Sequence, residues 1–306
     1  MHSRYIAVVG GVNLDISGTP AAPMIAGDSN PGEVQVTYGG VGRNIAENIA
    51  RLGQSVKMIT ALGDDGYTTP LRAFCESSGI DMSYSGVILG MRNSTYLCIN
   101  DEHGDVLYAI ADMAICDRIT PEFLEGRRSV LEKASLIVAD ANLSPETLVW
   151  LCESFDVPVM ADPVSVTKST RLLKALPHLY CVKPNRPEAE ALSGIAIRED
   201  ADLETAAAVL LEKGCRQVFI SLGARGVYFD NGKIRGIQPC LVRDVVNTNG
   251  CGDAFFAAAA LGFLEGMSIA ESARLGQAAS AICAMSNAAV SPDLNRERLF
   301  HRYQEA

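Results

Sequence analysis

The sequence contains no C-x-x-C pair, and its cysteines and histidines form no metal-binding or disulfide pattern. The nine cysteines are odd in number, widely scattered and mostly placed within apolar runs, and the four histidines lie far apart. Disulfide frameworks and zinc sites show close, regular cysteine spacings. We therefore expect reduced, mostly buried thiols in a cytosolic protein, and neither a disulfide framework nor a zinc site.

Positive charge is scarce and long apolar runs are missing. The chain carries 26 Lys and Arg against 36 Asp and Glu, a net charge of −10. That balance argues against binding to nucleic acid or to anionic membranes, and no run approaches the roughly 18 apolar residues of a membrane span. We expect a soluble, cytoplasmic protein. A phosphorylated small ligand is compatible with the charge, because backbone N–H groups bind anions locally.

Two common phosphate-binding patterns are also absent. The P-loop G-x-x-x-x-G-K-[ST] does not occur, since the segment NGKIR at residues 231–235 lacks both the hydroxyl residue and the spacing. The first predicted strand is followed by VVGGVNLD rather than by G-x-G-x-x-G. These absences argue against a P-loop NTPase and against a dinucleotide oxidoreductase.

Apolar runs alternating with helical patterns fill most of the 306 residues, of which 48% are hydrophobic. This order predicts an α/β protein with a mainly parallel sheet and helices on both faces. Residues 12–38 and 94–111 alternate polar and apolar side chains instead, which indicates a small β-sheet lid over the carboxyl edge. We predict one domain over residues 1–306.

The individual elements follow from periodicity and from capping and turn residues. We predict strands at residues 5–11, 32–40, 55–63, 134–140, 157–163, 179–185 and 216–223. We predict helices at residues 41–53, 68–79, 144–155, 165–176, 186–194, 202–214, 253–266 and 268–286, and hairpins at 94–112 and 226–239.

The segment NTNGCGDAFF, residues 247–256, places two glycines and one carboxylate directly before an apolar helix. Gly250, Cys251 and Gly252 can direct backbone N–H groups toward the negative charge that builds up during phosphoryl transfer. Asp253 can accept the proton of an attacking hydroxyl. A helix start with an acidic first turn explains Asp253 as well, but not the paired glycines.

The segment KPNRPEAE follows an apolar strand and places Asn185 and Glu188 three residues apart at a helix start. Their oxygen atoms suit the water shell of a Mg²⁺ ion that bridges ATP phosphates. An Asn N-cap followed by Pro and Glu explains the same residues. The two interpretations stay open at this point.

The segment SLGARG, residues 221–226, lies at a strand end, where open α/β sheets bind ligands. Ser221, Gly223 and Gly226 would allow close approach by nucleotide phosphates. A tight turn into the following hairpin is the favoured interpretation of this segment alone.

Two further segments carry polar residues beside glycines. In GGVNLD, Asn13 and Asp15 point the same way on an extended chain and suit the vicinal hydroxyls of a sugar. In YGGVGRN, Gly40 precedes a helix whose first turn holds Arg43 and Asn44, an arrangement open to a polar ligand. An Asx turn and a plain glycine turn are the competing interpretations.

Taken in order, these segments resemble the ribokinase-like carbohydrate kinases of the PfkB family, over essentially the whole chain. The pair NRPE and GCGD is specific, and the other motifs are supportive. The resemblance implies a ribokinase-like, Rossmann-type sandwich with a lid, the substrates ATP and a sugar or nucleoside, and Mg²⁺.

The resemblance also implies residue roles. Asp253 would be the general base, the N–H groups of Gly250, Cys251 and Gly252 the anion hole, and Glu188 with Asn185 the Mg²⁺ site, the metal held through water. The implied ATP-binding residues are Lys183, Asn185, Ser221, Gly223 and Gly226. The implied nucleoside-binding residues are Asn13, Asp15, Gly40, Arg43, Asn44 and, at the end of a lid strand, Asp112.

The segments VGRN, VADANLS and ADPVS point, within the family, to phosphorylation of the 5′-hydroxyl of pseudouridine rather than of ribose. Another PfkB kinase acting on ribose, uridine or adenosine, and a non-catalytic nucleoside sensor, are the alternatives. Cys251 stands where many members have alanine. Asn247 stands where many have an aspartate that helps bind K⁺, so K⁺ activation stays open. Lid strands in this family often pair between subunits, so we expect a homodimer.

Overall fold

The computed structural model describes residues 4–242 and 245–305. Residues 1–3, 243–244 and 306 of the predicted domain lie outside the described residues. The main sheet has eight strands in the order β14-β13-β12-β11-β10-β9-β1-β4. Its strands are β1 Tyr5–Val9, β4 Ser55–Ile59, β9 Leu136–Asp140, β10 Val159–Asp162, β11 Cys181–Val182, β12 Gln217–Ser221, β13 Val227–Asp230 and β14 Arg235–Gln238.

Six of these strands run parallel, from β12 to β4, and β13 and β14 form an antiparallel hairpin at one edge. Alternate residues of the buried strands face opposite cores. In β1, Ile6 and Val8 belong to the core cluster that includes residues of helices α1 (Val41–Arg51) and α9 (Cys251–Leu264). Ala7 and Val9 belong to the opposite cluster, which includes residues of α5 (Pro145–Glu153) and α8 (Asp200–Glu212). The predicted α/β fold with a mainly parallel sheet is confirmed, and burial on both faces explains the apolar central strands β1, β9 and β10.

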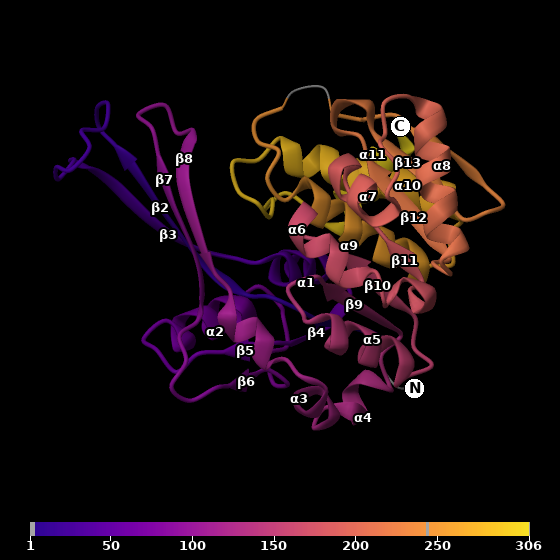
Figure 1. Cartoon of the computed structure of the whole chain (residues 1–306), viewed down its shortest axis with the longest axis horizontal. Helices are drawn as coiled ribbons and strands as arrows, with labels where there is room; N and C mark the ends of the chain where they lie inside the picture. Colours follow the sequence, from indigo (N-terminus) through magenta and orange to yellow (C-terminus); the bar gives the residue numbers. More distant parts are fainter. Residues whose placement is uncertain (1–3, 243–244, 306) are drawn as a thin grey trace.

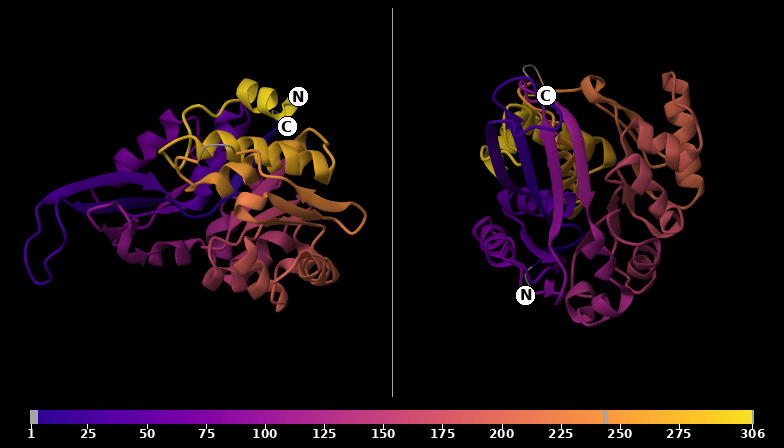
Figure 2. Two further views of the ribbon diagram at one scale, coloured as in Figure 1. Left: turned by 90° about the horizontal axis from the view of Figure 1, so that it is seen from above. Right: turned by 60° about the vertical axis from the view of Figure 1, so that its left-hand side comes forward.

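Helices cover both faces, with α9 and α10 on one side and α7 and α8 on the other (Figure 2). The helices are α1 Val41–Arg51, α2 Thr68–Ser77, α3 Pro121–Glu125, α4 Arg128–Leu131, α5 Pro145–Glu153, α6 Val166–Ser169, α7 Arg186–Ser193, α8 Asp200–Glu212, α9 Cys251–Leu264, α10 Ile269–Ala284 and α11 Arg296–Gln304. None of them, within the described residues, is long and apolar enough to cross a membrane.

A second sheet projects from the body as a long arm (Figure 1). It has the order β3-β2-β7-β8, with β2 and β7 parallel and the outer pairs antiparallel. Its strands are β2 Asn13–Pro20, β3 Gly32–Gly39, β7 Ser94–Asn100 and β8 Val106–Asp112, and a separate small sheet joins β5 Ala61–Leu62 to β6 Gly86–Val87. Because β2 begins four residues after β1 ends, one short loop connects the main sheet to this lid.

The single helix predicted for residues 165–176 is wrong. The chain there forms only α6 and 3₁₀ turns at Thr170–Leu172 and Leu176–His178. Ser169 donates to the Val166 carbonyl at 2.7 Å, and such side-chain bonds compete with helix propagation. The prediction also missed α3, α4 and α11, of which the first two are only five and four residues long.

Candidate active site

A cavity of about 490 Å³ lies beyond the carboxyl ends of the parallel strands. Nine of the predicted site residues line it together: Lys183, Asn185, Glu188, Ser221, Gly223, Gly226, Cys251, Gly252 and Asp253. Its other wall comes from the segment before α9 and from α10. It contains the apolar Val242, Val245 and Ala284 together with the polar Gln277 and Ser280. The cavity thus has a charged end and an apolar end.

Helix α9 begins at the charged end. Gly250 is its N-cap with φ +76°, and a Cβ there would collide with the Ala289 carbonyl, so the backbone itself requires glycine. A Cβ on Gly252 would lie 3.3 Å from the Lys183 amine. The Cys251 N–H donates to the Thr248 carbonyl at 3.3 Å. The first N–H groups of a helix have no partner within it, and they favour an anion.

Asp253 lies in the first turn of α9 and receives a hydrogen bond of 2.8 Å from the Asn44 amide. Burial and the nearby Asp162 carboxylate raise the pKa of Asp253 to about 7, although Asn44, Lys183 and Arg43 act in the opposite direction. A carboxylate with a pKa near neutrality can take a proton from a hydroxyl and return it.

Lys183 faces Asp253 from the end of β11. Its amine lies 3.2 Å from Oδ2 of Asp162, and both side chains are buried. Burial lowers the pKa of Lys183, but Asp162, Glu188 and Asp253 outweigh it and the pKa is raised. The Lys183 ammonium therefore lies among three carboxylates.

Asn185 and Glu188 form a capping box at the start of α7. The Asn185 N–H donates to Glu188 Oε2 at 2.8 Å, and the Glu188 N–H donates to Asn185 Oδ1 at 3.0 Å. The capping interpretation is confirmed, yet both residues also line the cavity. Burial raises the pKa of Glu188, opposed chiefly by the bond from the Asn185 N–H.

The glycine pair of YGGVGRN makes room for the polar residues of GGVNLD. A Cβ on Gly39 would collide with the Asp15 carboxylate, and a Cβ on Gly40 would lie 2.8 Å from Asn13 Oδ1. Asn13 in turn donates to Asp15. Burial raises the pKa of Asp15 to about 6 against the lowering effect of Arg43. The two segments are separate along the chain, and in the fold they form one polar site.

Asp140 was not predicted from the sequence, and its hydrogen bonds connect this polar site to the main sheet. Its carboxylate accepts the N–H groups of Gly11 at 2.8 Å, Gly42 at 2.9 Å and Asn142 at 2.9 Å. Asn142 accepts a bond of 2.6 Å from Lys168.

Asp162 was missed in the same way. Asp140 and Asp162 are paired in register as the last residues of β9 and β10. Their position at the carboxyl ends of adjacent apolar strands was the signal that could have identified them.

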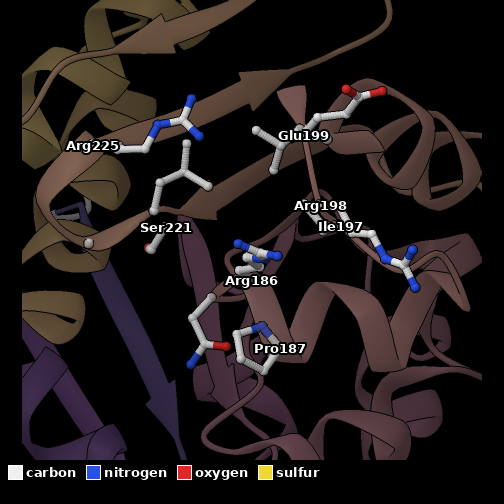
Figure 3. A pocket seen from close by; sticks show the side chains of 11 residues that line it. Arg186, Pro187, Ile197, Arg198, Glu199, Ser221 and Arg225 are labelled. Atoms are coloured by element: carbon white, nitrogen blue, oxygen red, sulfur yellow. The ribbon is translucent and has the colours of Figure 1, made fainter. Parts of the chain in front are cut away.

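The SLGARG segment leaves β12 through a tight turn, as predicted. Gly223 and Gly226 have φ of +59° and +100°, and a Cβ on Gly226 would lie 2.6 Å from the Cys240 nitrogen. A second cavity of about 330 Å³ shares Asn185, Ser221 and Gly223 with the first. In Figure 3, Arg225 and Glu199 lie in the upper part of the view of this second cavity, and Ser221, Arg186 and Pro187 lie below them.

The remaining predicted residues differ in how they reach the site. Asn44 contacts Asp253 directly, and Arg43 donates to Asn44. Asp112 is exposed at the end of β8 and does not line either cavity. Gly250 shapes the backbone behind the cavity rather than lining it.

The fold is an open α/β sheet with a cavity at the carboxyl ends of its parallel strands, the usual place for a small-molecule ligand in such folds. The chain belongs to the pfkB family of carbohydrate kinases, whose sequence profile matches residues 3–295. It is therefore an ATP-dependent sugar or nucleoside kinase.

Individual relatives agree with this assignment. The chain is 36% identical over 293 residues to pseudouridine kinase of Escherichia coli K12, covering 95% of this chain and 94% of that protein. A putative sugar kinase from Clostridium perfringens superposes with a TM-score of 0.89 at 32% identity, over 100% of this chain and 97% of that one. Arabidopsis thaliana ribokinase, complexed with ribose and ATP, shares the fold with a TM-score of 0.90 at 21% identity, over 99% of both chains.

Proposed function

We propose that the protein transfers the γ-phosphoryl group of ATP to the 5′-hydroxyl of pseudouridine, giving pseudouridine 5′-phosphate and ADP. The position of Asp253 carries the proposal. This carboxylate, with a pKa of about 7, contacts Asn44 on one side and lies in the cavity with Lys183 on the other. The identity to the E. coli pseudouridine kinase supports the substrate.

Asp253 accepts the proton of the 5′-hydroxyl as the oxygen attacks phosphorus in line with the departing ADP oxygen. The N–H groups of Cys251 and Gly252, two residues that line the cavity, stabilise the charge on the transferred group, and Gly250 holds the backbone turn that presents them. Because the Cys251 N–H donates to Thr248 at 3.3 Å in this conformation, it exchanges that bond for the phosphoryl oxygen.

The cavity suits ATP along its length. The adenine ring packs at the apolar end, and the phosphates pass Ser221, Gly223 and Gly226 toward the charged end. Lys183 and Asn185 contact the phosphates there. Lys183 is well suited to this role because its pKa is raised, so it stays charged.

The donor chemistry of the charged end suits Mg²⁺. Three carboxylates lie around the Lys183 ammonium. Within the described residues, no three His, Cys, Asp or Glu side chains are grouped so that they could enclose a metal ion by themselves. Mg²⁺ is commonly held by few protein oxygens together with waters and phosphates. Glu188 and Asn185 would hold the ion through water, and the ion would neutralise phosphate charge. A K⁺ requirement stays a prediction to be tested, because Asn247 replaces the usual aspartate.

The nucleoside occupies the polar site beneath the lid, held by Asn13, Asp15, Arg43 and Asn44 and shaped by Gly40. Arg43 is buried, and its Nε–H has no acceptor within residues 4–242 and 245–305. A substrate hydroxyl would supply that acceptor. Asp112 would reach the base only if the lid strand that carries it moves over the site.

The lid is proposed to pair with the lid of a second copy. Its outer strands expose apolar side chains, with Val34 and Tyr108 each 72% exposed and Ile110 67% exposed. Such a contiguous apolar surface is unusual on a monomer. Sedimentation equilibrium would report a dimer, and Val34→Lys combined with Ile110→Lys would convert it to a monomer; a monomeric wild type would refute the pairing.

The test is ADP release with Mg²⁺-ATP across pseudouridine, uridine, adenosine, ribose and fructose 6-phosphate. We expect turnover mainly with pseudouridine and a loss of at least about 10³-fold in Asp253→Asn. The matched control is Asp156→Asn, at an exposed aspartate that lines neither cavity and has no proposed role. Preference for another compound would keep the kinase and replace the substrate. Binding of nucleoside without turnover would favour a sensor.

A further inference from the structure

Glu47 is a buried carboxylate that the proposed reaction does not use. It lies on α1 with only 4% of its side chain exposed, and two guanidinium groups hold it. Arg43 lies 2.5 Å from Oε2, and Arg51 lies 2.8 Å from Oε1. Both arginines are four residues away along the helix, the spacing at which side chains meet.

A chain of hydrogen bonds leads from Glu47 to Asp253. Arg43 uses one nitrogen for Glu47 and its other terminal nitrogen for the Asn44 side-chain oxygen. The Asn44 side-chain nitrogen then donates to Asp253 Oδ2 at 2.8 Å. An amide presents oxygen or NH₂ depending on how it is flipped. Because Arg43 takes the oxygen, Asn44 can present only its NH₂ to Asp253.

The members of this chain have little freedom to rearrange. Arg43 is 3% exposed and Asn44 is 8% exposed. The Arg43 guanidinium also stacks 5.5 Å from the centre of the Phe74 ring. Without the Glu47 carboxylate, the buried guanidinium would lose its counter-charge, and a buried unpaired cation moves or draws in water.

We infer that Glu47 is a positioning residue for the base: through Arg43 and Asn44 it fixes the orientation of the Asp253 carboxylate toward the attacking hydroxyl. This inference rests on the proposed role of Asp253. Other titratable groups also act on Asp253 or respond to it: Asp162 at the end of β10, Lys183 after β11, and the thiols of Cys251 and Cys283. None of them belongs to the hydrogen-bonded series from Glu47 to Asp253.

The decisive variant is Glu47→Gln, which keeps the shape of the side chain and one acceptor oxygen. Removal of a negative charge alone would lower the pKa of Asp253. Loosening of Arg43 and Asn44, both of which lower the pKa of Asp253, would raise it. Arg43 and Asn44 are among the groups that act most strongly on the pKa of Asp253, whereas Glu47 is not, so the second effect is the larger one. We therefore expect the acidic limb of the kcat/KM profile to move to higher pH in Glu47→Gln, by about half a unit.

Two further variants complete the test. Arg43→Met combined with Glu47→Leu removes both buried charges, and such exchanges are often tolerated by the fold. We expect it to move the acidic limb upward by about one unit. Arg51→Gln is the matched control, because Arg51 binds the same carboxylate on the side away from Asp253. Its profile should match that of the wild type.

The assay uses whichever substrate the wild type phosphorylates, so an error in the proposed substrate does not affect it. If the wild type phosphorylates none, a ¹³C titration of the Asp253 carboxyl carbon, assigned with Asp253→Asn, reads the same shift. The inference would be overturned if, in Glu47→Gln, the acidic limb of the kcat/KM profile or the pKa of the Asp253 carboxyl group stays in place or moves to lower pH. A rise in the KM for the nucleoside in Glu47→Gln, with no change in the pH profile, would also overturn the inference. It would show that Glu47 supports Arg43 as a substrate contact only.

Discussion

The amine of Lys183 lies 3.2 Å from the Asp162 carboxylate, and this buried pair joins the ends of two neighbouring strands of the main sheet. The pair places a cation beside Gly252, at the start of α9. It is both a structural contact and, in the proposed reaction, part of the phosphate site. Replacement of either partner should therefore affect stability and activity separately.

Lys183→Met leaves the Asp162 carboxylate buried without its cation. We expect a loss of about 3 kcal/mol in the free energy of unfolding, together with a large rise in the KM for ATP. Lys183→Met combined with Asp162→Asn should recover most of the stability without recovering activity. Urea denaturation and ATP kinetics measure the two effects. Full activity in the stable double variant would contradict a role for Lys183 in phosphate binding.

The pH dependence of the reaction should reflect Asp253. Since the base must be ionised and its pKa is raised to about 7, kcat/KM should fall below pH 7 with a slope of one. A steady-state profile from pH 5 to 9 with constant ionic strength measures it. An acidic limb near pH 4 would mean that Asp253 is more solvated than this conformation indicates.

Asp253→Asn should stabilise the fold while it abolishes turnover. The folded-state pKa of Asp253 lies above the ordinary value of 3.8, so ionisation of this group costs stability as pH rises from 4 through 7. The difference between a pKa of about 7 and the ordinary 3.8 corresponds to about 4 kcal/mol, so we expect a gain of this order at pH 8 that disappears near pH 4. Thermal unfolding at both pH values tests it. A gain independent of pH would implicate packing rather than charge.

Gly39→Ala should weaken nucleoside binding, because its Cβ would displace the Asp15 carboxylate. We expect the nucleoside KM to rise by about 10-fold with little change in the KM for ATP. Gly66→Ala is the matched control, since no atom lies within 4 Å of the Cβ position there. Equal kinetics in both variants would show that Asp15 does not contact substrate.

Cys251→Ala should keep activity within about three-fold, because the proposed anion hole uses the backbone N–H and not the thiol. Gly250→Ala, one position earlier, should lose at least about 100-fold, since a Cβ at φ +76° would collide with the Ala289 carbonyl. Steady-state kinetics on both variants provides the comparison. A severe loss in Cys251→Ala would assign a role to the thiol itself.

Local patterns predicted much of this architecture. The apolar strands, the glycine-rich helix start at Gly250 and the hairpin turn at Asn231 depend on neighbouring residues and on backbone conformation. The parallel sheet and its two-sided core follow from the order of the elements. The failure at residues 165–176 is also local, because serine and threonine side chains there bond to their own backbone.

The site was predicted only where glycines or caps mark it. No glycine or capping pattern accompanies Asp140, Asp162 or Lys168 in the sequence. An aspartate at a strand end or a lysine in a short helix also has several ordinary structural explanations. Asp140 is identified by three N–H groups that come from different segments. Such convergence is a property of the folded chain.

Local propensity and periodicity were enough to predict most of the elements, their order and the chemical groups available at the strand ends. Which of those groups meet follows only from how the chain folds. Asn44 contacts Asp253 across 209 positions, and the resulting burial raises the pKa of Asp253 to about 7. The reason is physical: desolvation and Coulomb interactions depend on distances in space, which no local pattern specifies.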